Sequence, residues 1–278
     1  MITNKSIKQQ AKESLKGNWI KYILILLATS AISGIFIDLA SKEYDFLEGI
    51  IYSFIPFLNE NVQEVSGIFY IIAIITEILA SVITTKIALD IVDNKKYSFK
   101  DLFPNVKVFI KAIILTLVET ILIALWMCLL IIPGIIKSYS YSMSLYILIK
   151  HPEYSILDCI TESRHIMNGN KMNLFSLHVS FLGYYLLSAV CYALPMVALF
   201  TTNKNISNSS NSLISILLSI LFIIIIIFAA VIQLYSVPYY RISEAVFYNR
   251  VSGEDTIDTI VTNNSYEGDI IVESEEIS

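Results

Sequence analysis

The sequence predicts an all-α membrane protein with six transmembrane helices. They form three helical hairpins, each preceded by a short cytoplasmic amphipathic helix. Two observations favour this fold class. The 278-residue chain is 55% hydrophobic and 15% charged, with a mean hydropathy of +0.67, whereas soluble globular proteins carry about 25% charged residues. Several apolar runs also reach the roughly 20 residues that a helix needs to cross a bilayer, without the short alternating segments of a membrane β-barrel.

The opening segment of the chain is basic and amphipathic. Residues 3–16 place Ile7, Ala11 and Leu15 on one stripe, with lysines on the next, which indicates a helix that lies on an anionic membrane surface. A Gly-Asn pair then predicts the end of this helix. The first span follows at about 19–39, and we interpret it as an uncleaved anchor because no clear cleavage site follows it.

The middle of the chain carries a Pro-Gly pair at Pro133 and Gly134, which predicts a structural turn between two spans. A further amphipathic helix is expected over 151–168, before an Asn-Gly-Asn end. An acidic tail over 251–278 is expected to be disordered. One membrane domain over residues 1–250 thus contains six predicted spans, at about 19–39, 68–92, 108–132, 135–149, 174–200 and 213–237.

The basic residues predict how the chain is threaded. With both termini in the cytoplasm, six spans leave only Lys42, Lys137 and Lys204 of the 19 Lys and Arg residues outside, as the positive-inside rule favours. A five-span arrangement, with residues 135–149 outside the membrane, would place several more Lys and Arg residues on the external side. The fourth span is the weak point, because its helix reaches about 22 Å against about 30 Å of hydrocarbon. Composition suggests a bacterial source, so we expect the inner (cytoplasmic) cell membrane.

Two acidic residues mark a candidate intramembrane site. Glu77 and Glu119 lie near the middle of the second and third spans, where a charge costs at least about 2.5–3.5 kcal/mol. Their depths differ by about 6 Å, so we expect them to share a proton or to bond hydroxyls of the fourth span, with Ser138, Tyr141 and Ser142 as candidates. The alternative is that the acids make neutral interhelical hydrogen bonds and that the small hydroxyl residues only pack helices.

Cytoplasmic lysines form a second candidate site, for anionic lipid headgroups. The alternative is the ordinary positive-inside bias, which also gathers lysines on this side. The candidate headgroup contacts are Lys8, Lys12, Lys16, Lys95 and Lys96.

No motif predicts catalysis. The chain has no nucleotide-binding loop, HExxH, GxSxG or Cys/His cluster, so we expect no enzyme, metal, cofactor or nucleic-acid partner. The cysteines Cys128, Cys159 and Cys191 are interpreted as small buried hydrophobes. His178, near the inner end of the fifth span, is expected to be an interhelical hydrogen-bond partner.

Two functions remain open from these residues. The leading hypothesis is a non-enzymatic membrane component that acts by contacts with lipid headgroups and with a partner protein or a second copy. The alternative is a small transporter or exporter of an ion, lipid or amphipathic molecule that uses Glu77 and Glu119.

Two amphipathic segments end alike, at Glu13-Ser14…Gly17-Asn18 and at Glu162-Ser163…Gly169-Asn170. The spacing after Glu-Ser differs between them, so an internal duplication is a hypothesis at this stage.

Several motifs together carry a resemblance. They are LKGNW (15–19), DLF (101–103), LW…LLIIPGIIKSYSYSM (125–143), ES…MNGNK (162–171), LFSLHVSFLGYYLL (174–187) and VPYYRISEAVFY (237–248). The chain resembles, over roughly residues 5–250, a family of uncharacterised bacterial multi-pass membrane proteins, domain of unknown function 975. The resemblance implies an integral membrane protein and supplies no catalytic residue.

Overall fold

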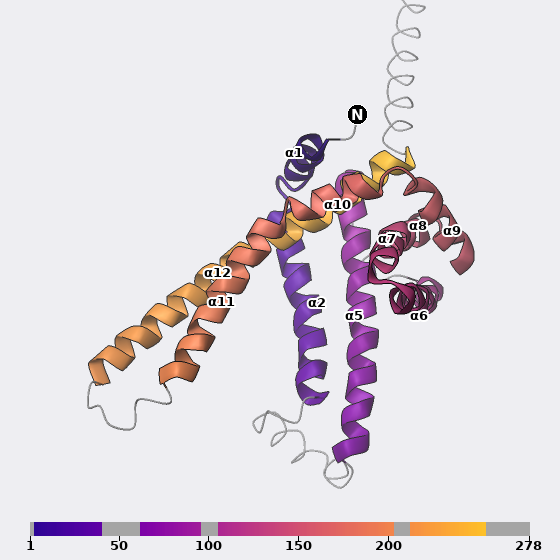
Figure 1. Ribbon diagram of the computed structural model, residues 1–278. Coiled ribbons are helices and arrows are strands. Elements are labelled where there is room, and N and C mark those ends of the chain that lie inside the picture. The colour runs from indigo at the N-terminus through magenta and orange to yellow at the C-terminus, as the bar shows by residue number, and fades with distance from the viewer. Residues whose placement is uncertain (1–2, 41–61, 96–104, 203–211, 254–278) are drawn as a thin grey trace, which may run out of the picture.

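The computed structural model describes residues 3–40, 62–95, 105–202 and 212–253, and every regular element within them is a helix (Figure 1). This confirms the predicted all-α class. The helices are α1 (Asn4–Ser14), α2 (Trp19–Ala40), α5 (Val62–Val92), α6 (Val106–Leu129), α7 (Ile131–Tyr141), α8 (Ser144–Lys150), α9 (Ile156–Ile166), α10 (Lys171–Val179), α11 (Leu182–Thr202) and α12 (Ser212–Ser252).

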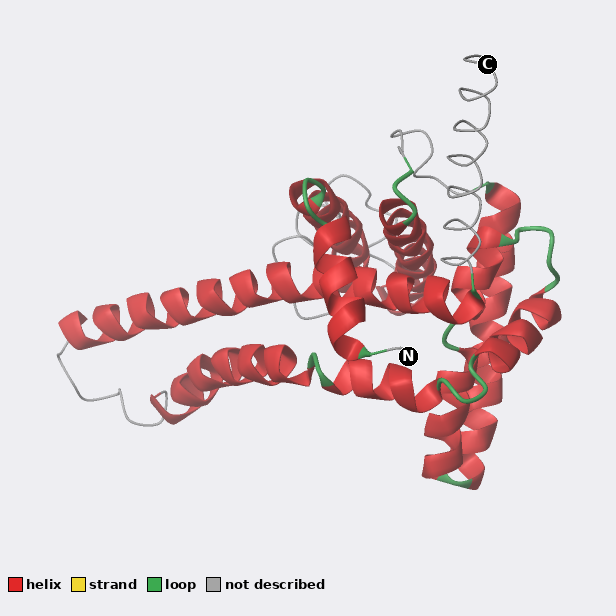
Figure 2. Cartoon of the chain, turned by 90° about the horizontal axis from the view of Figure 1, so that it is seen from above, coloured by secondary structure: helices red, strands yellow, loops and turns green. Residues whose placement is uncertain are grey.

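Three helix pairs diverge from one shared group of short helices and helix ends. The pairs are α2 with α5, α6 with α7, and α11 with α12. Seen from above in Figure 2, the α11–α12 pair extends well away from the rest of the molecule. The shared group, which we call the hub, consists of α1, α8, α9, α10, residues 82–95 and residues 236–252.

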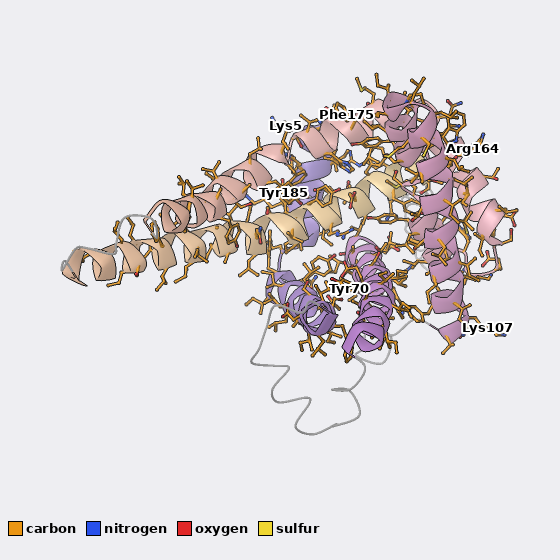
Figure 3. All side chains as sticks on the ribbon, turned by 60° about the horizontal axis from the view of Figure 1, so that its bottom comes forward. Lys5, Tyr70, Lys107, Arg164, Phe175 and Tyr185 are labelled. Carbon is orange, nitrogen blue, oxygen red and sulfur yellow. The ribbon has the colours of Figure 1, made fainter. Side chains whose placement is uncertain are left out.

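The hydrophobic core lies in the hub. Within α5, Val82 and Ile87 near the C-terminal end are 1% and 0% exposed, whereas Ile71 and Ile74 are 60% and 58% exposed. Tyr70 projects from this outer part of α5 (Figure 3). The diverging pairs therefore present apolar side chains outward, as lipid-facing helices do, while the hub buries a core of its own.

Within the described part of the chain, five helical stretches are long and apolar enough to cross a membrane. A protein with such helices has the character of a membrane protein. The six-span arrangement is not confirmed, because the predicted span at 135–149 is not among the five. The stretches are Trp19–Leu39, Gly67–Val92, Val106–Leu129, Lys171–Pro195 and Leu217–Ser252.

The predicted fourth span is not one helix. It is divided into α7 and α8 by a break at Ser142 and Met143. Ser163 of α9 compensates for this break, because its hydroxyl donates to the Ser140 carbonyl at 2.9 Å and accepts from the Met143 N–H at 3.2 Å. One side chain thus satisfies two backbone groups that a continuous helix would have paired internally. The local apolar pattern does not reveal a partner twenty residues away.

The corner between α6 and α7 lies at Leu130, not at Pro133 and Gly134 as predicted. Leu130 is extended, with φ −158° and ψ 137°. Pro133 is the third residue of α7, where a helix needs no N–H donor, and the Gly134 N–H makes the bond to the Leu130 carbonyl at 3.2 Å. A Cβ on Gly134 would lie 3.0 Å from the Met127 Cα and closer still to its Cγ. Glycine is therefore needed for close helix packing rather than for the turn.

The amphipathic helices α1 and α9 are copies of one structural motif. Both have 11 residues and a hydroxyl N-cap, and both are followed by a glycine at positive φ, +87° at Gly17 and +83° at Gly169. The repeat aligns on these glycines, which is why alignment on the Glu-Ser pairs gave unequal spacing. Equivalent residues differ by 152 in number, and the three inward-facing pairs are all 0% exposed: Ile7 with Cys159, Ala11 with Ser163, and Leu15 with Met167.

The apolar face of α1 therefore packs into the hub instead of lying on a membrane surface. Tyr239 of α12 donates its hydroxyl to the Lys8 carbonyl at 3.1 Å, and Arg250 donates to the Ser6 hydroxyl at 2.6 Å. These bonds hold the beginning of the chain against the last described helix.

The fifth and sixth predicted spans also differ from the structure. The fifth, 174–200, is divided into α10 and α11 at Ser180 and Phe181. The sixth was expected to end at 237, but α12 continues through Pro238 to Ser252. A proline removes one helical hydrogen bond, and packing against neighbouring helices tolerates that loss. Residues 254–278, most of the predicted tail, lie outside the described part of the chain.

Candidate functional site

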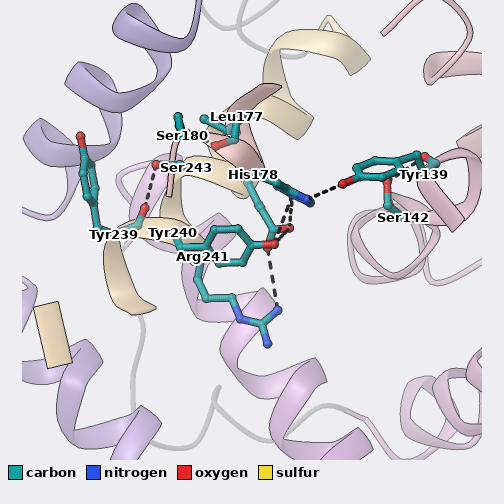
Figure 4. Close-up of polar contacts among 10 residues, drawn as sticks. Tyr139, Ser142, Leu177, His178, Ser180, Tyr239, Tyr240, Arg241 and Ser243 are labelled. Carbon is teal, nitrogen blue, oxygen red and sulfur yellow. Dashed lines mark hydrogen bonds and ion pairs between the residues drawn. The ribbon is translucent and has the colours of Figure 1, made fainter. Parts of the chain in front are cut away.

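A cluster of polar side chains lies where α7, α10 and α12 meet (Figure 4). We call it the polar junction, and it consists of Tyr139 from α7, His178 from α10, and Tyr240, Arg241 and Glu244 from α12. Glu244 is 12% exposed at its side chain and His178 is 25% exposed. Half-buried ionisable groups of this kind need partners, and the junction supplies them.

The hydrogen bonds of the junction converge on one carboxylate oxygen. His178 Nε2 lies 3.1 Å from Glu244 Oε1, and the Tyr240 hydroxyl donates to the same oxygen at 2.7 Å. The Tyr139 hydroxyl lies 3.3 Å from His178 Nδ1. We assign the imidazole proton to Nε2, because a carboxylate can only accept, and Tyr139 then donates to Nδ1.

Sequence spacing on α12 builds half of the junction. Tyr240 and Glu244 are four residues apart and face the same side of the helix, and Arg241 Nη1 lies 3.9 Å from Glu244 Oε2. The Phe181 and Tyr240 rings pack in a T-shaped arrangement, with centroids 5.5 Å apart. The arrangement can hold a proton and link three helices. Among the described residues no three His, Cys, Asp or Glu side chains gather as metal ligands.

The prediction for His178 as an interhelical hydrogen-bond partner is confirmed. Sequence reasoning missed Glu244 and Tyr240, because they lie beyond the predicted end of the sixth span. The Tyr-x-x-x-Glu spacing from 240 to 244 was the available signal. Its partner on α10 could only come from the fold.

A second ionic cluster joins the ends of α5, α8 and α12. Asp93 accepts a hydrogen bond from Lys150 at 2.6 Å, from Asn249 at 2.7 Å and from Lys95 at 3.1 Å. Burial alone would raise the pKa of Asp93, but the hydrogen bonds from Lys150 and Asn249 and the Lys150 charge hold it below its ordinary value. The ends of three helices are thereby tied to one carboxylate.

The structure does not pair the two predicted intramembrane acids. Glu77 is exposed on α5, and Glu119 is half-buried on α6; no hydrogen bond or ion pair between them is found in the described residues. One Glu119 oxygen, Oε1, is buried with no partner in the same part of the chain. The neighbouring Ser144 donates its proton to the Tyr141 carbonyl at 2.8 Å.

The predicted hydroxyl residues of the fourth span satisfy themselves locally. Ser138 donates to the Ile135 carbonyl at 2.8 Å, and Ser142 donates to the Tyr139 carbonyl at 3.0 Å. Tyr141, at the end of α7, is 6% exposed and belongs to the hydrophobic core cluster that also contains the hub residues. These contacts support close packing of the hub.

The predicted headgroup lysines occupy different settings. Lys8 donates to the Ser180 carbonyl at 3.0 Å, and its Nζ lies 4.2 Å from the Phe181 ring centroid. Its ammonium therefore contacts both residues that separate α10 from α11. Burial lowers the pKa of Lys8. Lys12, Lys16 and Lys95 are exposed on the hub. Lys96 lies outside the described residues.

Comparison with known families finds one that covers the chain. The family described as Protein of unknown function (DUF975) matches residues 1–137 and residues 127–255. No curated protein and no solved structure matches the chain.

Proposed function

The chain belongs to the DUF975 family of proteins of unknown function, and from that premise we propose that it is a non-enzymatic membrane component whose hub contacts lipid headgroups at the cytoplasmic face of the inner membrane. The diverging helix pairs would anchor it. A partner protein or a second copy of the chain remains a further candidate for contact.

The hub favours an even number of membrane crossings. The first residues of α2, the end of α5 and the end of α12 all meet there: Tyr22 donates to the Thr84 carbonyl at 3.1 Å, and Asn249 donates to Asp93 at 2.7 Å. Lys111, near the start of α6, likewise donates to the Tyr154 carbonyl at 2.8 Å. Each helix pair therefore leaves from the hub and returns to it.

The α6–α7 pair is too short on its return to cross the bilayer. The 11 residues of α7 reach about 16 Å, roughly half of the 30 Å hydrocarbon thickness. We therefore infer four crossings, by α2, α5, α11 and α12, with α6–α7 as a re-entrant hairpin that enters the bilayer and turns back.

The corner of this hairpin supports the re-entrant arrangement. Its residues carry no polar side chain that would seek water on a far side; Leu129 to Ile132 are each 66–72% exposed. Both backbone groups of the extended residue Leu130 are paired internally, because its N–H bonds the Trp126 carbonyl at 3.0 Å and its carbonyl accepts from the Gly134 N–H. Internal pairing of such groups is favoured in a hydrocarbon environment.

The exposed basic residues support a cytoplasmic hub in contact with headgroups. Several basic side chains are exposed on hub elements and at their ends, next to the hub-side ends of the apolar helix pairs. They are Lys12, Lys16, Lys95, Arg164 and His165. This adjacency of a basic hub and outward-facing apolar helices is the observation that carries the proposal. Lysines and arginines near the surface attract anionic lipids by about 1 kcal/mol each.

The test is a comparison of lipids with the purified protein. Phosphatidylglycerol should bind in preference to phosphatidylcholine and raise the melting temperature in detergent, because binding to the native state stabilises it. Equal binding of both lipids would contradict the proposal.

The transporter alternative is favoured by one observation, the buried Glu119 oxygen with no partner in the described residues. Ionisable groups at such positions often serve ion or proton movement. If the transporter alternative holds, Glu119→Gln and Glu77→Gln will each reduce flux in proteoliposomes. Glu13→Gln, at an exposed side chain of α1, will not. If none of the three substitutions alters the flux, the transporter alternative is excluded.

A further inference from the structure

We propose that the face formed by α7, α9 and α10 is a specific binding site for one anionic phospholipid, with its phosphate in a cationic pocket and an acyl chain in the adjoining apolar groove. This inference rests on the proposed function and names a site that the predicted headgroup lysines do not include.

The cationic pocket has a volume of about 380 Å³. Three of its side chains are basic: Lys137 from α7, Arg164 from α9, and Lys171 from α10. None of its lining residues carries a carboxylate. One acidic side chain contacts a lining residue, because Glu162 Oε1 lies 3.9 Å from His165 Nδ1. The remaining lining residues are Ser140, Thr161, His165 and Asn168.

The charges of the pocket favour a phosphate. Arg164 presents a guanidinium, whose fork of donors matches two phosphate oxygens. Lys171 is the first residue of α10, and Asn170 gives that helix no side-chain cap, so the positive end of the helix dipole adds to the potential. Ser140 and Thr161 add hydroxyls suited to headgroup oxygens.

An apolar groove of about 280 Å³ continues from the pocket, and Lys171 lines both. Its other lining residues are Ile135, Ile136, Tyr139, Met172 and Phe175. In Figure 3, Phe175 lies on the α10 side and Arg164 on the α9 side of this end of the molecule. The site thus has a charged compartment and an apolar compartment, which fits an amphipathic anion.

Contacts between helices fix the walls of this site. Ser163 ties α9 to the break between α7 and α8, and Tyr139, whose ring lines the groove, is held by His178. Lys137 Nζ lies 4.7 Å from the Trp126 ring centroid, which positions its ammonium beside the membrane hairpin. A preformed site loses less entropy on binding.

The occupant follows from the two compartments together. Free phosphate would use the charges and leave the groove empty. A zwitterionic lipid would bring its own ammonium among three cations. An anionic phospholipid satisfies both parts, and basic pockets between membrane helices are known to hold such headgroups.

The experiment is a titration of the detergent-purified full chain with dioleoyl phosphatidylglycerol, monitored by native mass spectrometry. Arg164→Gln combined with Lys171→Gln should weaken binding about 25-fold, at about fivefold per charge. The matched control is Lys5→Gln combined with Lys107→Gln, which removes two exposed charges that neither line the pocket nor belong to the named headgroup contacts, and it should leave affinity within about twofold. Arg164→Lys, which keeps the charge, should recover part of the binding.

A second arm tests the groove. Phe175→Ala should weaken dioleoyl phosphatidylglycerol and leave dihexanoyl phosphatidylglycerol unchanged, because only the long chain reaches the groove. Equal loss for both lipids, or full displacement of dioleoyl phosphatidylglycerol by millimolar inorganic phosphate, would overturn the phospholipid assignment.

The outcomes separate this site from the wider proposal. Loss of binding in a variant with Lys12→Gln and Lys16→Gln, two of the exposed hub lysines, but not in the Arg164/Lys171 variant would overturn the pocket and leave a headgroup-binding hub intact. A wild-type protein that binds phosphatidylglycerol no better than phosphatidylcholine would overturn both.

Discussion

At the scale of single residues, Gly134 has a structural role that its neighbour Pro133 obscures. The Pro-Gly pair suggests a turn, yet the chain turns at Leu130 and Gly134 serves as the point of closest approach between two helices. A Pro-Gly pair is compatible with a turn and also with a close contact between two helices. Only the packing of α7 on α6 shows which of the two applies here.

Gly134→Ala should destabilise the protein by about 1–3 kcal/mol, because the new methyl group would overpack against Met127. Gly183→Ala is the matched control: it lies within α11, where a Cβ would meet nothing within 4 Å, and it should be neutral or slightly stabilising. Thermal unfolding in detergent measures both. Equal stability of the two variants would contradict the close α6–α7 contact.

Asp93 gives a prediction that depends on pH. Its pKa in the folded protein lies below the ordinary value of 3.8, so its contribution is fully present above that pH and is lost as the pH falls through the lower, folded value. Asp93→Asn should therefore cost about 3 kcal/mol at pH 7, by loss of a buried charge pair with Lys150. The difference from wild type should shrink below about pH 4.

The control for this prediction is Lys95→Gln. Lys95 contacts the same carboxylate but is 62% exposed, so its loss should cost under about 1 kcal/mol. A cost for Lys95→Gln that equals the cost for Asp93→Asn would show that burial of the cluster has been misjudged.

At the scale of helices, apolar periodicity predicted where long helices exist but not where they are interrupted. The first three spans correspond to α2, α5 and α6 within a few residues, because long apolar runs dominate their local pattern. The break between α7 and α8 depends instead on Ser163, a long-range partner. The continuation of α12 through Pro238 likewise depends on packing in the hub.

The candidate site, too, was predictable where it depends on local sequence and not where it depends on which helices are adjacent. His178 was predicted as a hydrogen-bond partner from its place near a helix end, whereas Glu244 and Tyr240 required knowledge that α10 and α12 are adjacent. The cationic pocket was missed because Lys137 was placed on the opposite side of the membrane from Arg164 and Lys171. The structure places all three around one cavity.

Ser163→Ala tests the break between α7 and α8. It leaves the Ser140 carbonyl and the Met143 N–H without their side-chain partner in the hub core, and each lost partner costs about 1–3 kcal/mol. Ser142→Ala, whose hydroxyl bonds only the Tyr139 carbonyl of its own helix, should cost under about 1 kcal/mol. If urea unfolding ranks the two variants in the opposite order, the role assigned to Ser163 is wrong.

At the scale of the whole molecule, a duplicated motif explains the arrangement. Both α1 and α9 end at a left-handed glycine and lead into a long apolar stretch, and both bury their inner faces in the hub. The α6–α7 pair lies between the two copies in sequence. In the proposed topology, the short return helix and the apolar corner make this pair a re-entrant hairpin, and α7 forms one wall of the proposed lipid site.

The membrane side of Lys137 tests this account most directly. Lys137→Cys can be labelled with an impermeant maleimide in oriented vesicles of a variant in which Cys128 and Cys191 are serine. Lys16→Cys reports the hub side, and Asp38→Cys, near the end of α2 that points away from the hub, reports the opposite side. The re-entrant hairpin predicts that Lys137→Cys is labelled only from the side that reaches Lys16→Cys. Labelling only from the side that reaches Asp38→Cys would contradict the hairpin and the lipid site beside it.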